Sequence, residues 1–429
     1  PVDIHEPTTP VEASTLARIA REYPTLARAV REALRAGDSF LRRGLDRYLS
    51  AAALAPPVLQ ELEHHPERIT LATALFSRSD YAAELLARHA SDIRLLDGLD
   101  RPLAVLSSMG QPALFPQHEL DALRTACRQR SLEALARSAL GHCKPFETFS
   151  TLTMLSDWAL AAALPLTDSL PVPASEIAAA PFAVLALGRL GTGEMDFGSD
   201  ADLVFVAADS LSPQQREPWR RLAEQYIHVV SQTREGTLVP VDTRLRPQGN
   251  AGDIVVTAGG LWDYLASSAQ AWEALTWLKA RPVAGNLAFG AHVVQQVRQA
   301  LDSRWSSPEA QRQMATDLIA LRHRMEREGT GPKARGEFKH LPGSFFDIEY
   351  ILGLLAFRHR RAGSPAFAGN ALLQASALRA AQALDQTAAQ TLTSAATLFR
   401  STDHAHRVIT GVSANRAPEA ALAQRMAVL

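Results

Sequence analysis

The sequence has little of what marks secreted, membrane-spanning or nucleic-acid-binding proteins. Only two cysteines, Cys127 and Cys143, occur in 429 residues, so a disulfide framework is excluded and a reducing compartment is indicated. The net charge of −1 provides no overall positive field to attract nucleic acid, and no basic tract is interleaved with aromatic residues. No run approaches the roughly 18 apolar residues of a membrane-spanning helix, and the amino terminus lacks the basic and apolar segments of a secretory signal. We therefore expect a cytoplasmic protein with no nucleic-acid or membrane partner.

The chain is too long for a single apolar core, and its patterning predicts three parts. Residues 1–170 are rich in alanine, leucine, arginine and glutamate, with apolar residues at helical spacing, which predicts an N-terminal helical domain. Residues 171–285 carry short apolar runs between glycines and are expected to form a small α/β domain. From Leu261 onward the pattern is helical again, so residues 286–429 are predicted to form a C-terminal helical bundle. The predicted fold class is α+β and mostly helical.

Within the middle part we predict a buried strand at Phe182–Leu187, a second at Leu203–Ala208, a third at Leu238–Leu245 and a short fourth at Ile254–Thr257. Ser212 and Pro213 are typical of a helix start between the second and third strands. This order of elements predicts a small sheet with acidic residues at its edge.

Three aspartates carry the candidate chemistry. Asp200 and Asp202 stand two apart at the start of the second apolar run, so on a strand they share one face. Asp242 lies within the third apolar run. A carboxylate in an apolar run costs several kcal/mol unless it is paired or bound to metal, so these acids predict a site for divalent cations. Two cations about 4 Å apart are typical of phosphoryl and nucleotidyl transfer.

The neighbouring residues leave two interpretations open. The glycines from Gly188 to Gly193 match neither a dinucleotide fingerprint nor a Walker loop, so they form either an ordinary turn or a phosphate contact. Ser199 either satisfies that turn or binds a phosphate oxygen. By the two-residue period of a strand, Asp242, Arg244 and Arg246 share a face, as a structural ion-pair set or as one metal ligand beside two phosphate-binding arginines.

The segments LGRLGTGEMDFGSDADLVFV and VDTRLRPQGNAG resemble the nucleotidyltransferase unit of the glutamine synthetase adenylyltransferase/adenylyl-removing enzyme family, within the DNA polymerase beta-like superfamily. The superfamily pattern corresponds here to Gly188, Asp200, Asp202 and Asp242. Arg189 replaces the small residue usual after that glycine, although this family itself has a basic residue there. The segments at Ser79–His89, Ala271–Gly285 and Phe338–Ile351 are also similar to family segments.

The resemblance implies two Mg²⁺ ions held by Asp200, Asp202 and Asp242, with ATP as substrate and a tyrosine of glutamine synthetase as acceptor. It further implies that Gly188, Arg189, Ser199, Arg244 and Arg246 contact the nucleotide. Family members usually carry two such units, and one is present here. The adding activity is the expectation, the removing phosphorylase is an alternative, and a non-catalytic half that binds nucleotide or a PII-type signal protein is the third.

Two further acids, Asp347 and Glu349, lie about 200° apart around a predicted helix and cannot share one face. We expect one to be buried against the basic loop Gly329–Gly343 and the other to be exposed. A structural ion pair and a contact with the active site both remain open for them.

Overall fold

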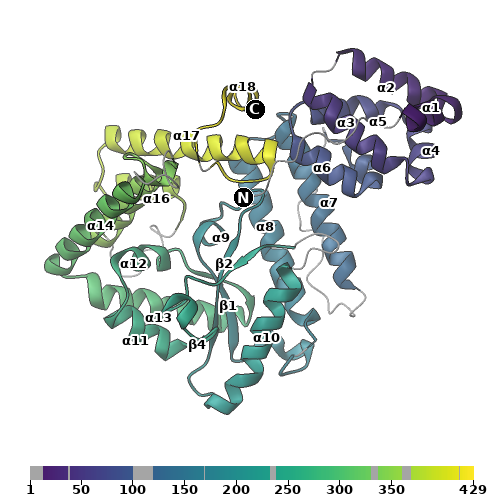
Figure 1. Ribbon diagram of the computed structural model, residues 1–429. Coiled ribbons are helices and arrows are strands. Elements are labelled where there is room, and N and C mark those ends of the chain that lie inside the picture. The colour runs from purple at the N-terminus through teal and green to yellow at the C-terminus, as the bar shows by residue number, and fades with distance from the viewer. Residues whose placement is uncertain are drawn as a thin grey trace.

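The computed structural model describes residues 13–36, 39–99, 119–168, 170–231, 238–329, 337–359, 369–414 and 416–429. Helices dominate, and a small five-stranded sheet lies at the centre (Figure 1), so the predicted α+β, mostly helical class is confirmed. The sequence also predicts a loop broken by Pro102, Pro112 and Pro116 and a helix end at Gly236, and these residues lie outside the described ranges.

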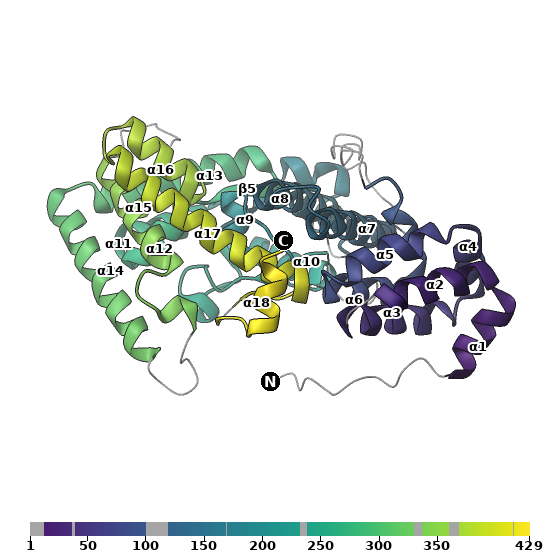
Figure 2. The ribbon, with the colours of Figure 1, turned by 90° about the horizontal axis from the view of Figure 1, so that it is seen from above.

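The N-terminal part forms the expected helices, and proline marks the starts of several of them because it fits the first helical turn. They are α1 (Ala13–Glu22), α2 (Pro24–Ala36), α3 (Ser39–Ala52), α4 (Pro56–His64), α5 (Glu67–Phe76), α6 (Asp80–Arg88), α7 (Glu119–Ala139) and α8 (Pro145–Ala163). Their apolar faces join one side of the sheet in a single continuous cluster of buried residues. Figure 2 shows the first six helices at one end of an elongated molecule.

Helix α8 differs from one sequence-based expectation. Together with the short turn after it, the segment Pro145–Leu166 is long and apolar enough to cross a membrane by length and composition, whereas we had expected no such stretch. However, 61% of its most apolar window is buried inside the protein. Packing against α7 and the sheet therefore accounts for its apolar residues.

The sheet has the order β3-β2-β1-β5, with β4 also paired to β2. Its strands are β1 (Phe182–Ala186), β2 (Ala201–Ala207), β3 (Val241–Asp242), β4 (Val255–Thr257) and β5 (Arg281–Gly285). β1 runs antiparallel to β2 and β5, whereas β3 and β4 run parallel to β2. All five residues of β1 are buried because helices cover both faces of the sheet.

Two details of the predicted sheet were wrong. The third strand is two residues long, because the chain turns away after Asp242 and passes through left-handed backbone at Gln248 and Gly249. Strand β5 was missed, because Arg281, Pro282 and Gly285 give it a weak strand signal. Pro282 is tolerated there because β5 is an edge strand and the missing N–H costs no central ladder bond.

Helices fill the rest of the described chain. They are α9 (Gly188–Thr192), α10 (Pro213–Ser231), α11 (Ala258–Ser267), α12 (Ala271–Trp277), α13 (Leu287–Trp305), α14 (Pro308–Glu328), α15 (Phe345–His359), α16 (Ala371–Ala380), α17 (Gln386–Thr410) and α18 (Ala420–Met426). The helix start predicted at Ser212 and Pro213 is confirmed, and a capping box stabilises it, since the side chains of Ser212 and Gln215 each accept a hydrogen bond from the other's backbone N–H. The segment from Gly188, predicted as a glycine turn, is the one-turn helix α9.

Helix α17 connects the parts of the molecule. It runs from the C-terminal helices across the end of the sheet to the N-terminal helices (Figure 1). At that far end, Ser79 of α6's N-terminus donates a hydrogen bond of 2.5 Å to the carbonyl of Val408. Gly411, which ends α17 in left-handed backbone, packs on the ring of Tyr81.

Candidate active site

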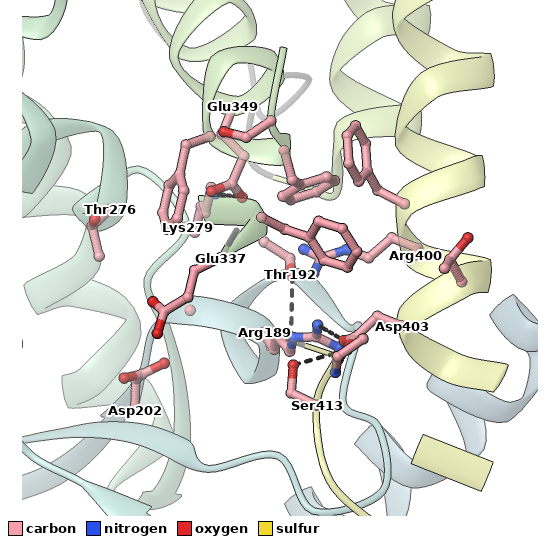
Figure 3. Close-up of a pocket in the computed structure, with 18 of the residues that line it drawn as sticks. Arg189, Thr192, Asp202, Thr276, Lys279, Glu337, Glu349, Arg400, Asp403 and Ser413 are labelled. Carbon is pink, nitrogen blue, oxygen red and sulfur yellow. Dashed lines mark hydrogen bonds and ion pairs between the residues drawn. The ribbon is translucent and has the colours of Figure 1, made fainter. Parts of the chain in front are cut away.

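A cavity of about 640 Å³ lies between the end of the sheet and the C-terminal helices, which is a usual size for a small-molecule site. Its floor carries Gly188 and Asp202 from the end of β1 and the start of β2. Its walls carry Lys279 from the turn after α12 and charged residues from α15 and α17. Figure 3 shows these side chains converging from segments far apart in the sequence. The lining also includes four phenylalanines, Phe338, Phe345, Phe346 and Phe399.

Asp202 and Gly188 fit against each other at the cavity floor. A Cβ on Gly188 would lie 1.9 Å from Oδ2 of Asp202, and the backbone of Gly188 is left-handed with φ of +54°. Only glycine meets both conditions. Burial, reinforced by the negative charges of Asp242 and Asp200, raises the pKa of Asp202 to about 6. The structure therefore keeps an acid here whose charge is costly without a cation.

Asp242 lies directly beside Asp202, because the two residues are register partners in the β2–β3 ladder. Its carboxylate accepts several hydrogen bonds from Arg244, including 2.8 Å from the backbone N–H and 2.8 Å from Nε, and these hydrogen bonds hold its pKa below the usual range. Asp200 is exposed at the start of β2. Asp242 and Asp200 lie close enough for their charges to raise the pKa of Asp202, but within the described ranges no group of three or more metal-binding side chains is preassembled.

The arginines of this region do not share the face that we predicted for them. Because β3 ends at Asp242, Arg244 folds back onto that carboxylate while its own side chain stays 71% exposed. Arg246 is buried and donates to the carbonyls of Thr243 and Gly252, so it braces the loop. The expectation of one shared face was wrong, and their contact with a nucleotide stays a prediction.

Two other predicted residues lie close by, Arg189 on α9 and Ser199 on the loop between α9 and β2. Arg189 lines the cavity, and its guanidinium donates to Asp403 of α17 at 2.5 Å. Ser199 is buried, and its Oγ has no hydrogen-bond partner in the part of the chain that the structure describes. A buried hydroxyl without a partner is costly and marks a position that can accept a ligand atom.

Several cavity residues escaped the sequence analysis. Lys279, which precedes β5, pairs with Glu349 of α15 at 2.5 Å across the cavity wall. Burial alone would raise the pKa of Glu349, but the charges of Lys279 and Arg400 outweigh it and the pKa is lowered. In Figure 3 the carboxylates of Glu337 and Asp202 point toward one another at one end of the cavity. Helical spacing carries no signal for such pairs, because their members are brought together only by tertiary packing.

Asp347 and Glu349 are both about a quarter exposed, so the expectation of one buried and one exposed acid was wrong. Their contacts differ, as their opposite placement on a helix requires. Asp347 pairs with Arg322 of α14 at 2.6 Å, whereas Glu349 lines the cavity.

A buried ionic cluster fastens the floor of the cavity to α17. Asp403 accepts hydrogen bonds from Arg189, from Arg407 at 2.9 Å and from Ser413 at 2.8 Å. The next residue of α17, His404, contacts Asp196 at 2.8 Å. The loop that carries Ser199 and Asp200 is therefore set by α17 as well as by the sheet.

Replacing Asp403 by alanine is expected to destabilise the protein by about 3–5 kcal/mol, because two largely buried guanidinium groups lose their shared partner. Chemical denaturation monitored by circular dichroism measures this change. Glu217→Gln is the matched control, since that carboxylate pairs with Arg220 and Arg221 on an exposed face of α10 and should leave stability unchanged. An Asp403→Ala protein as stable as this control would contradict the structural role of the cluster.

A family model and the curated relatives of this chain point to the same protein family. Residues 69–296, just over half of the chain, match the family model described as glutamate-ammonia ligase adenylyltransferase. The chain is 30% identical over 334 residues to the bifunctional glutamine synthetase adenylyltransferase/adenylyl-removing enzyme of Streptomyces coelicolor, covering 76% of this chain and 33% of that protein. The enzyme of the same name from Aromatoleum aromaticum is 28% identical over 348 residues, covering 78% of this chain and 36% of its own length.

The chain thus spans about a third of the length of the curated relatives that it matches. The matched residues contain the whole sheet together with Gly188, Asp200, Asp202 and Asp242. On this basis the chain belongs to the glutamate-ammonia ligase adenylyltransferase family.

Proposed function

We propose that this chain transfers AMP from ATP to a tyrosine of glutamine synthetase and so controls nitrogen assimilation in the cytoplasm. The observation that carries the proposal is the placement of Asp202 on the floor of a nucleotide-sized cavity, packed on Gly188 and in register with Asp242. The names of the relatives supply the acceptor protein and the nucleotide.

Magnesium fits the residues present. Burial and the two neighbouring acids raise the pKa of Asp202 more than the charge of Arg244 lowers it, and carboxylate oxygens are the ligands that Mg²⁺ prefers. Asp202, Asp242 and Asp200 would hold it. When bound, the ion would neutralise charge on the phosphates of the substrate. Arg244 would release Asp242 for this role, which its exposed side chain can do without unpacking the core.

The rest of the cavity suits ATP. The four phenylalanines offer faces for the adenine ring, and base stacking on such rings contributes about 1–3 kcal/mol per base. Oγ of Ser344 is buried at this cavity and has no partner among the described residues, so it is free to bond a polar atom of the nucleotide. In the reaction, the tyrosine oxygen bonds to the α-phosphorus, the bond to pyrophosphate breaks and the hydroxyl proton is lost.

The removing reaction is the second candidate, and the position of Lys279 favours it. In that reaction phosphate attacks the AMP–tyrosine linkage, so that ADP leaves and the tyrosine is regenerated. A lysine at the cavity wall supplies positive charge for an incoming phosphate. A non-catalytic half that binds nucleotide or a PII-type protein is disfavoured, because the buried charge of Asp202 would destabilise the fold without contributing to catalysis.

Two incubations separate these functions. The chain is given labelled ATP, Mg²⁺ and unmodified glutamine synthetase, and separately phosphate, Mg²⁺ and adenylylated glutamine synthetase. Label on glutamine synthetase supports AMP addition, and release of ADP in the second mixture supports removal. If a folded chain that binds ATP gives neither labelled glutamine synthetase nor ADP, both catalytic proposals are overturned.

Magnesium is expected to stabilise the protein more at pH 7.5 than at pH 5. The pKa of Asp202 is raised from 3.8 to about 6, so its contribution to stability is full below the unfolded value and is lost as the pH rises through about 6. A cation relieves the charge only where it exists, and below pH 6 protons compete with it. Thermal unfolding with Mg²⁺ or with EDTA at both pH values measures the effect. Asp202→Asn should lose most of the magnesium response, and an equal response at both pH values would contradict the assignment.

A further inference from the structure

A second cavity lies away from the proposed nucleotide site. It has a volume of about 560 Å³ and is formed by the loop before α12, the end of α13 and the middle of α14. These helices lie on the side of the molecule opposite the N-terminal helices (Figures 1 and 2). Its lining shares no residue with the cavity that contains Asp202.

The charge of this cavity is positive. Its charged lining residues are Arg304, Arg324, Arg327 and Asp317. Asp317 is engaged by the amide of Gln313 at 2.8 Å, along α14 itself. Of the residues that the structure describes, none forms a hydrogen bond or an ion pair with Arg324.

Arg304 and Trp305, at the end of α13, complete the site. The guanidinium of Arg304 lies over the ring of Trp305, 5.0 Å from the ring centroid, and its Nη1 is buried without a hydrogen-bond partner in the described chain. Trp305 is 5% exposed, and its Nε1 is likewise buried without a partner among the described residues. Two buried N–H donors that lack acceptors beside a cavity indicate an acceptor that comes from outside the chain.

We propose that this cavity binds a small organic anion. Guanidinium groups recognise carboxylate and phosphate oxygens through paired hydrogen bonds, so Arg304 and Arg324 take the charged group. Trp272, Trp305 and Leu321 give the cavity an apolar surface for the body of the ligand. One turn of α12 separates this cavity from the cavity that contains Asp202. Trp272 lines the former and Thr276 lines the latter, and Thr276 donates a hydrogen bond to the carbonyl of Trp272.

Isothermal titration of the full chain with phenyl phosphate, phenylacetate and benzyl alcohol tests the proposal, with indole fluorescence as a second readout. The three probes share a ring, and they differ in carrying a phosphate, a carboxylate or a neutral head. We expect at least one of the two anions to bind with a Kd of roughly 1 mM or below, and benzyl alcohol to bind at least about tenfold more weakly. The better anion identifies which head group the site accepts.

Substitutions of Arg324 and Arg304 test whether the anion binds in this cavity. Arg324→Gln and Arg304→Gln should each weaken binding by about tenfold or more. Arg324 is exposed, so its replacement should not disturb folding. Arg312→Gln is the matched control, because Arg312 lies on the same helix, is 71% exposed and does not line the cavity. Failure of both anions to bind, equal binding by benzyl alcohol, or unchanged binding in both variants would overturn the proposal. None of these measurements depends on catalysis.

Discussion

Asp202→Asn is expected to lower the rate of AMP transfer by roughly a thousandfold or more while leaving the protein as stable as before or more stable. The substitution keeps the shape of the side chain but removes the charge that the cation requires. It also removes the destabilising charge, since burial and the neighbouring acids raise the pKa of Asp202 to about 6. A structural residue would show the opposite pairing, with stability lost together with activity.

The measurements are the steady-state transfer of label to glutamine synthetase and the melting temperature at pH 7.5. Asp200→Asn should also abolish transfer if the exposed acid completes the cation site. Asp263→Asn is the control, because that aspartate is exposed on α11 and does not line the cavity. Retained turnover in Asp202→Asn, or a marked fall in its melting temperature, would refute the metal assignment.

Gly188→Ala is expected to reduce transfer by at least about a hundredfold, because its Cβ would lie 1.9 Å from Oδ2 of Asp202 and must displace that carboxylate. Gly193→Ala provides a matched comparison. Gly193 also has left-handed backbone, with φ of +78°, but no atom lies within 4 Å of the added Cβ. Both variants bear the backbone strain of about 1–2 kcal/mol, so the difference between them isolates the contact with Asp202.

Parallel denaturation curves and kinetic assays of the two variants measure these effects. Gly193→Ala should retain most of the activity of the parent chain despite its lower stability. If the two variants lose activity equally, backbone strain rather than the fit against Asp202 explains the effect. If Gly188→Ala retains full activity, the carboxylate has another position available and the cavity floor is less constrained than the structure indicates.

Local patterns predicted a large part of the fold. Continuous apolar runs located β1, β2 and β4, and the Ser212–Pro213 start located α10. The strand signal failed at β5, whose Arg281, Pro282 and Gly285 are tolerated because the strand lies at the sheet edge. The strand predicted around β3 was too long, because the alternation of apolar and polar residues continues into a turn that is stabilised by Arg246.

The candidate site was predicted in part. The spacing of Asp200 and Asp202 and the apolar context of Asp242 pointed to acids at the end of a sheet, and the structure makes Asp202 and Asp242 register partners. The same reasoning could not locate Lys279 or Asp403, because each acquires its role from a partner on another element. Sequence separation hides such pairs, as Arg189 and Asp403 are 214 residues apart.

By itself the sequence determined the family, most of the helices, three of the five strands and the three acids, because these depend on short-range patterns of residue type. Only the tertiary structure decided which charges meet, since α17 brings Asp403 and Arg400 to the cavity from the far end of the chain. It also decided the pKa of Asp202, because burial and neighbouring charge depend on three-dimensional packing rather than on residue order.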